Sequence, residues 1–335
     1  MIKILFTNLI CILSISLLAS PKGGDKPGPA SSAHILEEIE KLNVLGSVLY
    51  IAAHPDDENT RLISWLANDK KVRTGYLSLT RGGGGQNLIG SEKGELIGAL
   101  RTQELLEARK IDGGTQFFSR AVDFGYSKTT DETLEKWNED EVLWDMVWVI
   151  RKFKPEIIIT RFPANKYAGH GHHSASAVLT NKAVEMAASP KVFPEQLKHV
   201  TAWRTKRLYY NTSSWWRKDL DKKYLTDDNL IRVDVGTYNA TLGKWNNQIA
   251  MESRSQHKSQ GFGASVNRGE QFEYLEYVSG DKAKQDLFDG IDLSWKRLAK
   301  TEQIQYQQDQ ILDKFDARNP SASVAQKSGQ GGNRP

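Results

Sequence analysis

Short apolar segments alternate with longer amphipathic ones through the first half of the chain, and this alternation constrains the fold more than any other feature. The apolar segments have the length and aliphatic composition of buried strands and cover Gly46–Ala53, Val72–Leu79 and Glu156–Thr160. The amphipathic segments have helical periodicity and cover Ala33–Asn43, Thr60–Asn68, Glu95–Ile111 and Glu132–Phe153. Strands alternating with helices predict an α/β fold with a mainly parallel sheet and helices on both faces.

Beyond Ser189 the periodic signals weaken. The patterns there predict strands at Lys206–Tyr210 and Ile231–Val235, and helices at Leu242–Glu252 and Ala283–Leu298. Hydrophobic residues make up 39% of the chain and charged residues 26%, which excludes a disordered protein and a multi-span membrane protein. We expect one domain over residues 33–316, followed by a disordered tail over residues 317–335.

The first twenty residues read as a secretory signal peptide, because Lys3 precedes an apolar run that ends in small residues. A permanent membrane anchor is the alternative, but the run is shorter than the roughly 20 residues of a spanning helix. A Pro/Gly/Ser linker follows over residues 21–32. We therefore expect an exported protein, periplasmic or extracellular, with no membrane span once the signal is removed.

Export would remove the only cysteine, Cys11, so disulfides and thiolate metal sites are not expected in the mature protein. It would also remove Lys3, the only charged residue in this segment, and lower the formal net charge from +4 to +3. A charge this small does not indicate a nucleic acid or an anionic membrane as partner.

Polar clusters directly follow three of the predicted strands. They cover His54–Glu58, Thr80–Asn87 and Arg161–His173. Parallel strands place their carboxyl ends at one edge of the sheet, where ligands of such folds bind. The sequence therefore predicts a functional site where these three segments meet.

The residue types in two of these clusters are those of a hydrolytic metal site, which needs three protein ligands and an open position for water. His54 and Asp57 can point at a common metal across Pro55, while Asp56 lies beside them as a general base for the attacking water. A distant histidine would complete the set, and three candidates lie together in Gly169–Ser174. Such a set suits zinc but also accepts iron, cobalt or manganese.

These motifs resemble the PIG-L or LmbE-like N-acetylglucosaminyl deacetylases. The resemblance rests on AHPDDE after a buried strand and on a histidine cluster before a helix, with further likeness at Arg101-x-x-Glu104 and His257-Lys-Ser-Gln260. It implies a Rossmann-like fold with the active site at the carboxyl edge of the strands. It also implies Zn²⁺ as cofactor, with His54, Asp57 and His173 as the metal ligands. By the same resemblance Asp56 is the general base, and His170 lies near the scissile carbonyl.

The chain departs from the family in the middle of the second motif, where Gly171 and His172 stand in place of proline and aspartate. A carboxylate that would orient a ligand histidine is therefore absent from this position. Its role is either taken by another residue or lost.

Four more residues are candidates for substrate binding: Arg81, Arg101, His172 and His257. Each of them could also have an ordinary structural role. The glycines after Arg81 form either an anion-binding nest or a mobile rim. Arg101 borders the site or pairs with Glu104 on its own helix, and His257 with Gln260 borders the site or ends a helix. The tryptophans Trp137, Trp215 and Trp216 stack on a sugar or serve packing.

The predicted reaction is removal of an acetyl group from an N-acetylglucosamine-containing sugar or glycoconjugate. One alternative keeps the metal site and changes the substrate to a non-sugar amide or an amide-linked conjugate. Another is a catalytically silent carbohydrate-binding protein, against which the retained Asp56 argues, because binding alone needs no base.

Overall fold

The structure is a computed structural model that describes residues 31–263 and 265–323. The predicted signal peptide, almost all of the predicted linker and residues 324–335 of the predicted tail lie outside these ranges. In the part of the chain that is described, no helix is both long and apolar enough to cross a membrane.

A seven-stranded sheet forms the centre of the fold, in the order β3-β2-β1-β4-β5-β9-β6. Its strands are β1 Ser47–Ala52, β2 Arg73–Ser78, β3 Thr115–Phe118, β4 Ile157–Thr160, β5 Arg207–Thr212, β6 Leu230–Asp234 and β9 Phe272–Gly280. The first five strands in the order pair in parallel, whereas β9 pairs antiparallel with both β5 and β6. The predicted mainly parallel α/β sheet is therefore confirmed.

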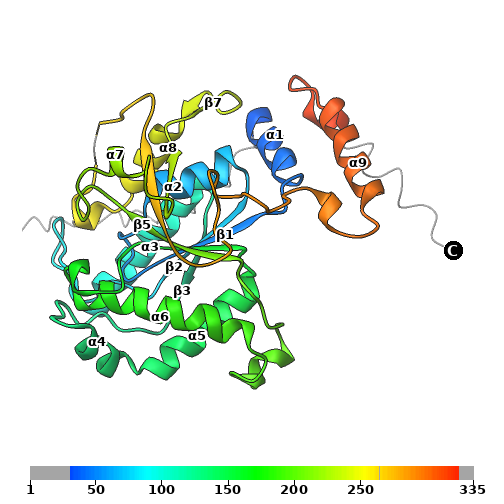
Figure 1. Ribbon diagram of the computed structural model, residues 1–335. Helices are drawn as coiled ribbons and strands as arrows, with labels where there is room; N and C mark the ends of the chain where they lie inside the picture. The colour runs from blue at the N-terminus through cyan, green and yellow to red at the C-terminus, as the bar shows by residue number, and fades with distance from the viewer. Residues whose placement is uncertain (1–30, 264, 324–335) are drawn as a thin grey trace, which may run out of the picture. The chain divides into compact units, whose positions relative to one another are not determined.

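Helices cover both faces of the sheet (Figure 1). On one face lie α4 Thr130–Trp137, α5 Glu139–Phe153 and α6 Gly171–Ala188, and on the other α2 Thr60–Ser64, α3 Glu95–Asp112 and α8 Asn246–Arg254. Neighbouring residues of β1 point to opposite faces, so Leu49 joins the core cluster under α5 and α6, and Tyr50 joins the cluster under α2. Both sides of this central strand are fully buried, as expected of a strand covered by helices on two faces.

The remaining elements are short or peripheral. They are α1 Ser32–Lys41, α7 Leu220–Lys223, α9 Glu302–Asp313, the β7 Tyr238–Asn239 and β8 Lys244–Trp245 pair, a π-helical turn Trp65–Asp69, and 3₁₀ turns at Lys166–Ala168, Pro194–Lys198, Lys258–Gln260, Trp295–Arg297 and Pro320–Ser323. α1 and α9 contact each other (Figure 1).

Two predicted helices were wrong. The segment Glu132–Phe153 is two helices, because Asn138 adopts a left-handed backbone conformation with φ of 54° between α4 and α5. Ala283–Leu298 is mostly irregular, with one 3₁₀ turn. There the Asp289 carboxylate accepts hydrogen bonds from three backbone amides of residues 284–286, and Gly290 follows with φ of 72°, so the chain turns instead of continuing a helix.

Candidate metal centre and catalytic site

The three polar segments leave the sheet at one edge. β1 lies between β2 and β4 and runs parallel to both. The segments that follow these strands, beginning at His54, Leu79 and Arg161, therefore start side by side. This arrangement brings the two metal-binding motifs together although they are more than a hundred residues apart in sequence.

His54, Asp57 and His173 form a compact set of potential metal ligands, with all ligand atoms within 4.8 Å of one another. Asp57 Oδ2 lies 3.0 Å from His54 Nδ1, and Asp57 Oδ1 lies 3.5 Å from His173 Nε2. Two ligand atoms bound tetrahedrally to one zinc ion lie about 3.3 Å apart. The spacing and chemistry of these donors therefore fit a divalent cation.

His173 is held with one ring nitrogen facing Asp57. Its Nδ1 lies 3.2 Å from the carbonyl oxygen of Ala168, and its ring stacks on Phe162 at a centroid distance of 3.8 Å. Only a protonated Nδ1 can donate to that carbonyl, so the lone pair of a neutral ring is on Nε2. Burial lowers the pKa of His173 and favours this neutral form.

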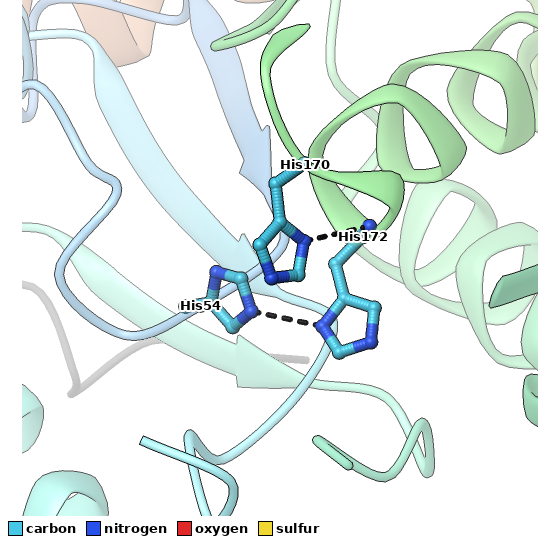
Figure 2. A group of neighbouring side chains, drawn as sticks. All are labelled: His54, His170 and His172. Carbon is cyan, nitrogen blue, oxygen red and sulfur yellow. Dashed lines mark hydrogen bonds between the residues drawn. The ribbon is translucent and has the colours of Figure 1, made fainter. Parts of the chain in front are cut away.

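His170 presents a hydrogen-bond donor to the cluster. It is the N-cap of α6, and its Nδ1 accepts a hydrogen bond of 3.0 Å from the backbone amide of His172 (Figure 2). The ring proton of a neutral His170 is therefore on Nε2, which points toward His54 and His172 in Figure 2. Burial, together with the nearby His54 and His173, lowers the pKa of His170 to about 4.

His172 lies behind the cluster, contrary to its predicted contact with a substrate. The residue has no exposed surface, and its ring packs against Phe124 and Trp137 at centroid distances of 4.4 and 4.9 Å. Its Nδ1 lies 3.0 Å from His54 Nε2 (Figure 2). His172 thus contacts a proposed ligand histidine from the position where the related motif has a carboxylate, and a hydrogen bond there fixes the orientation of the His54 ring.

His54, His170 and His172 form a second group of potential ligands, which shares His54 with the first. This group has no carboxylate to balance a divalent cation. In it the Nδ1 of His172 faces the His54 ring directly. The group that contains Asp57 is therefore the better match to a divalent cation.

Gly171 occupies a position where no side chain fits. A Cβ atom there would lie 2.3 Å from both Ser127 Oγ and the carbonyl oxygen of Thr129. Its backbone amide donates a hydrogen bond of 2.8 Å to the carbonyl of Ser127, which the proline of the related motif could not donate. The absence of a side chain at Gly171 therefore allows residues 127–129 to pack closely against the start of α6.

Gly171→Ala is expected to lower the free energy of unfolding by about 1–3 kcal/mol, because the added methyl group overlaps neighbouring oxygens. Urea denaturation followed by circular dichroism measures this change. Gly263→Ala is the matched control, since a Cβ at Gly263 meets no atom within 4 Å and its φ is not positive. Equal stability of the two variants would contradict this account of Gly171.

Asp56 has one carboxylate oxygen engaged and one available. Its Oδ1 accepts a hydrogen bond from Arg101 Nη2, and Arg101 Nη1 donates to the carbonyl of Gly82 at 3.0 Å. In the described ranges no donor is recorded for Oδ2. Arg101 therefore lies beside Asp56 and links it to the glycine-rich loop. It does not pair with Glu104, which accepts hydrogen bonds from Ser259.

A buried charged network lies behind the His54–Glu58 loop. Glu58 Oε1 lies 2.6 Å from His257 Nε2 and 3.4 Å from Arg109 Nη2, and Arg109 also pairs with Asp112. Asp112 in turn accepts a hydrogen bond of 2.6 Å from Ser253. His257 is fully buried, so its predicted contact with a substrate is replaced by a role in holding Glu58.

Arg109 and Asp112 were missed in the sequence. Their position on α3 could have revealed that they are buried, because they continue the buried face of the helix that includes Ile97, Arg101 and Leu105. Charged residues on an otherwise apolar stripe indicate a buried ion pair.

Arg81 is exposed and contacts Thr102 Oγ1 at 3.4 Å and the ring of Phe118. It does not line the cavity beside Asp57 and His173. Gln260 donates to the carbonyl of Gln86 at 2.7 Å. Of the tryptophans considered for sugar stacking, Trp137 is buried, whereas Trp215 is 89% exposed.

Comparison with known proteins gives a family match and several relatives. Residues 49–184 match the PIG-L family, described as GlcNAc-PI de-N-acetylase. Mycothiol S-conjugate amidase of Streptomyces coelicolor is 28% identical over 49% of this chain, and the chain spans only 60% of that relative's length. A 1D-myo-inositol 2-acetamido-2-deoxy-alpha-D-glucopyranoside deacetylase of Frankia casuarinae is 25% identical over 73% of this chain and 94% of its own length.

Among solved structures, N,N'-diacetylchitobiose deacetylase from Pyrococcus horikoshii matches with a TM-score of 0.48 and 19% identity, over 75% of this chain and 88% of that one. The residues clustered at the sheet edge, from His54 to His173, all lie inside the segment that matches the family. The chain therefore carries a domain of the PIG-L family over residues 49–184.

Proposed function

We propose that this protein is a zinc-dependent deacetylase that hydrolyses the acetamide of an N-acetylglucosamine-containing sugar or glycoconjugate. The observation that carries the proposal is the adjacency of a His54, Asp57 and His173 ligand set to the available oxygen of Asp56. The names of the relatives, which describe an amidase and deacetylases of N-acetylated sugars, support the same reaction class. The export signal predicted in residues 1–20 would place the substrate outside the cytoplasm.

The ligand set would hold the cation through His54 Nδ1, an oxygen of Asp57 and His173 Nε2. A cation bound there supplies Lewis acidity, both to the amide carbonyl and to the water that attacks it. His173 is oriented by the carbonyl of Ala168, and His54 by His172 on the opposite side of its ring. The protein thus holds both ligand rings with one ring nitrogen of each facing Asp57.

Asp56 acts as the base that takes a proton from the attacking water. Its Oδ2 is free for this contact, while Arg101 holds the other oxygen and so fixes the direction of the carboxylate. Glu58 cannot share the task, because it is buried and paired with His257. In this proposal Asp57 ligates the cation, Asp56 accepts the proton, and Glu58 anchors the loop.

His170 donates its Nε2 hydrogen to the oxygen of the amide as negative charge develops there. The low pKa of His170 keeps the ring neutral at neutral pH, and the α6 amide keeps the proton on Nε2. The residue is therefore better suited to stabilise the tetrahedral state by a hydrogen bond than to start as a protonated acid.

A second candidate keeps this machinery and changes the substrate to a non-sugar amide or conjugate. The likeness to a mycothiol S-conjugate amidase favours it. A silent carbohydrate-binding protein is less well supported, because Asp56 has a free oxygen and a dedicated partner in Arg101.

An assay of the released products distinguishes the three candidate functions, which are the sugar deacetylase, the non-sugar amidase and the silent binding protein. Metal-loaded protein is incubated with N-acetylglucosamine oligosaccharides, acylated peptides and simple acetamides, and free amine and acetate are quantified. We expect acetate and amine in equal amounts from the N-acetyl sugars. Release from the peptides or simple amides alone would replace the sugar assignment by the amidase, and binding without release from any substrate would contradict both enzymes.

A further inference from the structure

A cavity of about 360 Å³ opens directly onto the proposed catalytic residues. One side of it is lined by His173 and the three acidic residues of the first motif, Asp56, Asp57 and Glu58. The rest of its wall is aromatic and basic and comprises Arg161, Phe162, Trp215, Trp216, Arg254 and Phe262. A substrate that reaches the metal centre through this cavity therefore passes two arginines that the deacetylation itself does not use.

Neither arginine has a carboxylate partner. In the described ranges no Asp or Glu oxygen lies within 4.0 Å of Arg161 or Arg254, whereas the nearby Arg217 pairs with Asp227 at 2.6 Å and with Glu276 at 3.0 Å. Arg161 lies over Trp216, with its Cζ atom 5.0 Å from the ring centroid, and Arg254 lies over Phe262 at 3.9 Å. Both guanidinium groups are thus positioned by aromatic rings, which leaves their charge available.

The carboxylates of the site do not need these arginines for charge balance. Asp56 pairs with Arg101, and Glu58 is shared by His257 and Arg109. Asp57 faces His54 and His173 and would ligate the cation. Every acidic group of the motif therefore has its own positive partner, and the charges of Arg161 and Arg254 remain uncompensated at the mouth of the site.

The aromatic residues beside the arginines suit a sugar ring. Trp215 is 89% exposed although it lines the cavity, and Trp216 is partly buried beside it, 6.0 Å from Phe162. An exposed indole next to a site of sugar chemistry offers a flat apolar surface on which the apolar face of a pyranose can stack.

We propose that Arg161 and Arg254 form an anion-binding subsite, and that the substrate carries a carboxylate or phosphate group on or next to its N-acetylated sugar. This inference rests on the proposed function and narrows its substrate class to acidic glycans or sugar phosphates. Guanidinium groups bind both anions through paired, charge-assisted hydrogen bonds. The aromatic wall holds the sugar while the arginines hold its charged substituent.

The test compares charged and neutral substrates. N-acetylmuramic acid supplies a carboxylate, N-acetylglucosamine 6-phosphate a phosphate, and N,N'-diacetylchitobiose no charge. The ratio of kcat/KM for a charged substrate over the neutral one is measured for wild type, Arg161→Gln, Arg254→Gln and the paired control Arg217→Gln. We expect each of the first two substitutions to lower this ratio roughly 10-fold through KM, and the control to leave it unchanged.

Binding without turnover is measured in parallel, so that the subsite and the proposed function are tested separately. Isothermal titration of the charged sugars into Asp56→Asn protein should give a Kd that rises roughly 10-fold when Arg161→Gln or Arg254→Gln is added. That shift, with no acetate released from any substrate by wild type, would keep the subsite and reject the deacetylase. Turnover of the neutral sugar with unchanged ratios and unchanged Kd values would reject the subsite and keep the deacetylase.

Discussion

Alanine in place of His54 or His173 is expected to remove the divalent cation from the protein and to reduce turnover to background. The wild-type protein should bind about one equivalent per chain, since the cluster offers three protein ligands and one open position. Either substitution leaves only Asp57 and one histidine, which are too few ligands to hold the ion. Elemental analysis after gel filtration without free metal measures the bound equivalents, and circular dichroism verifies that each variant is folded.

His199→Ala is the control for this experiment. His199 is exposed and packs at the edge of Trp148, far from the cluster in the fold, so its loss should leave the bound metal and the activity unchanged. Full metal occupancy in both His54→Ala and His173→Ala would show that the cation is held elsewhere. Loss of metal from His172→Ala but not from His173→Ala would move the site to the three-histidine group.

The central sheet could be predicted from the sequence because its strands are buried on both faces. β1 and β4 read as continuous apolar runs bounded by polar clusters, which leaves little ambiguity about their position or their ends. β3 was missed because it is a four-residue strand with a partly exposed pattern. β9 was missed although its aromatic residues indicate a strand, since it pairs antiparallel and only some of its side chains are buried.

The helix errors have a common physical origin. Apolar residues three or four apart occur before the break, at Leu134 and Trp137, and again after it, at Val142 and Met146. The five-residue step from Trp137 to Val142 is the only irregularity, and it is too small to reveal the change of direction at Asn138. Between residues 283 and 298 the same spacing is produced by Leu287 and Ile291, which are buried in an irregular segment. The Asp289-Gly290 pair was the local signal for a turn, and it outweighs periodicity here.

At the site, motif spacing indicated which residues would come together, but not what each would contact. The second motif holds three histidines within four residues, and only their placement on the first turn of α6 distinguishes them. His170 caps the helix, His172 points into the core and His173 faces Asp57. Such differences depend on helix direction and packing against Trp137, which a single sequence does not display.

The same limit applies to the charged partners. Arg101 follows Asp56 by forty-five residues, and His257 follows Glu58 by one hundred and ninety-nine. These pairs form because α3 and the segment after α8 contact each other, and each contributes a side chain that reaches the loop after β1. The roles of the carboxylates in the first motif are thus set by long-range contacts, and this makes their separate substitution informative.

Asp56→Asn is expected to retain the cation and to lower kcat roughly 100-fold or more, the usual scale for removal of a general base. The amide keeps an oxygen that can accept the hydrogen bond from Arg101 but cannot take a proton from water. Asp57→Asn should behave differently, because it removes a charged ligand and therefore lowers metal affinity first. Bound metal and kcat measured on both variants separate a base from a ligand, although the two residues are adjacent.

Unchanged turnover in metal-loaded Asp56→Asn would place the base elsewhere. His172 is fully buried and cannot reach a water in the cavity without rearrangement. Glu58 lines the cavity but is only 2% exposed, and its Oε1 is already paired with His257 and Arg109. His170 would be the remaining candidate, because its Nε2 points into the cluster (Figure 2). To act as the base it would have to move its ring proton to Nδ1, which breaks the hydrogen bond from the His172 amide. A double variant, Asp56→Asn with His170→Gln, would then decide the assignment, since loss of turnover only in the double variant would transfer the role of the base to His170.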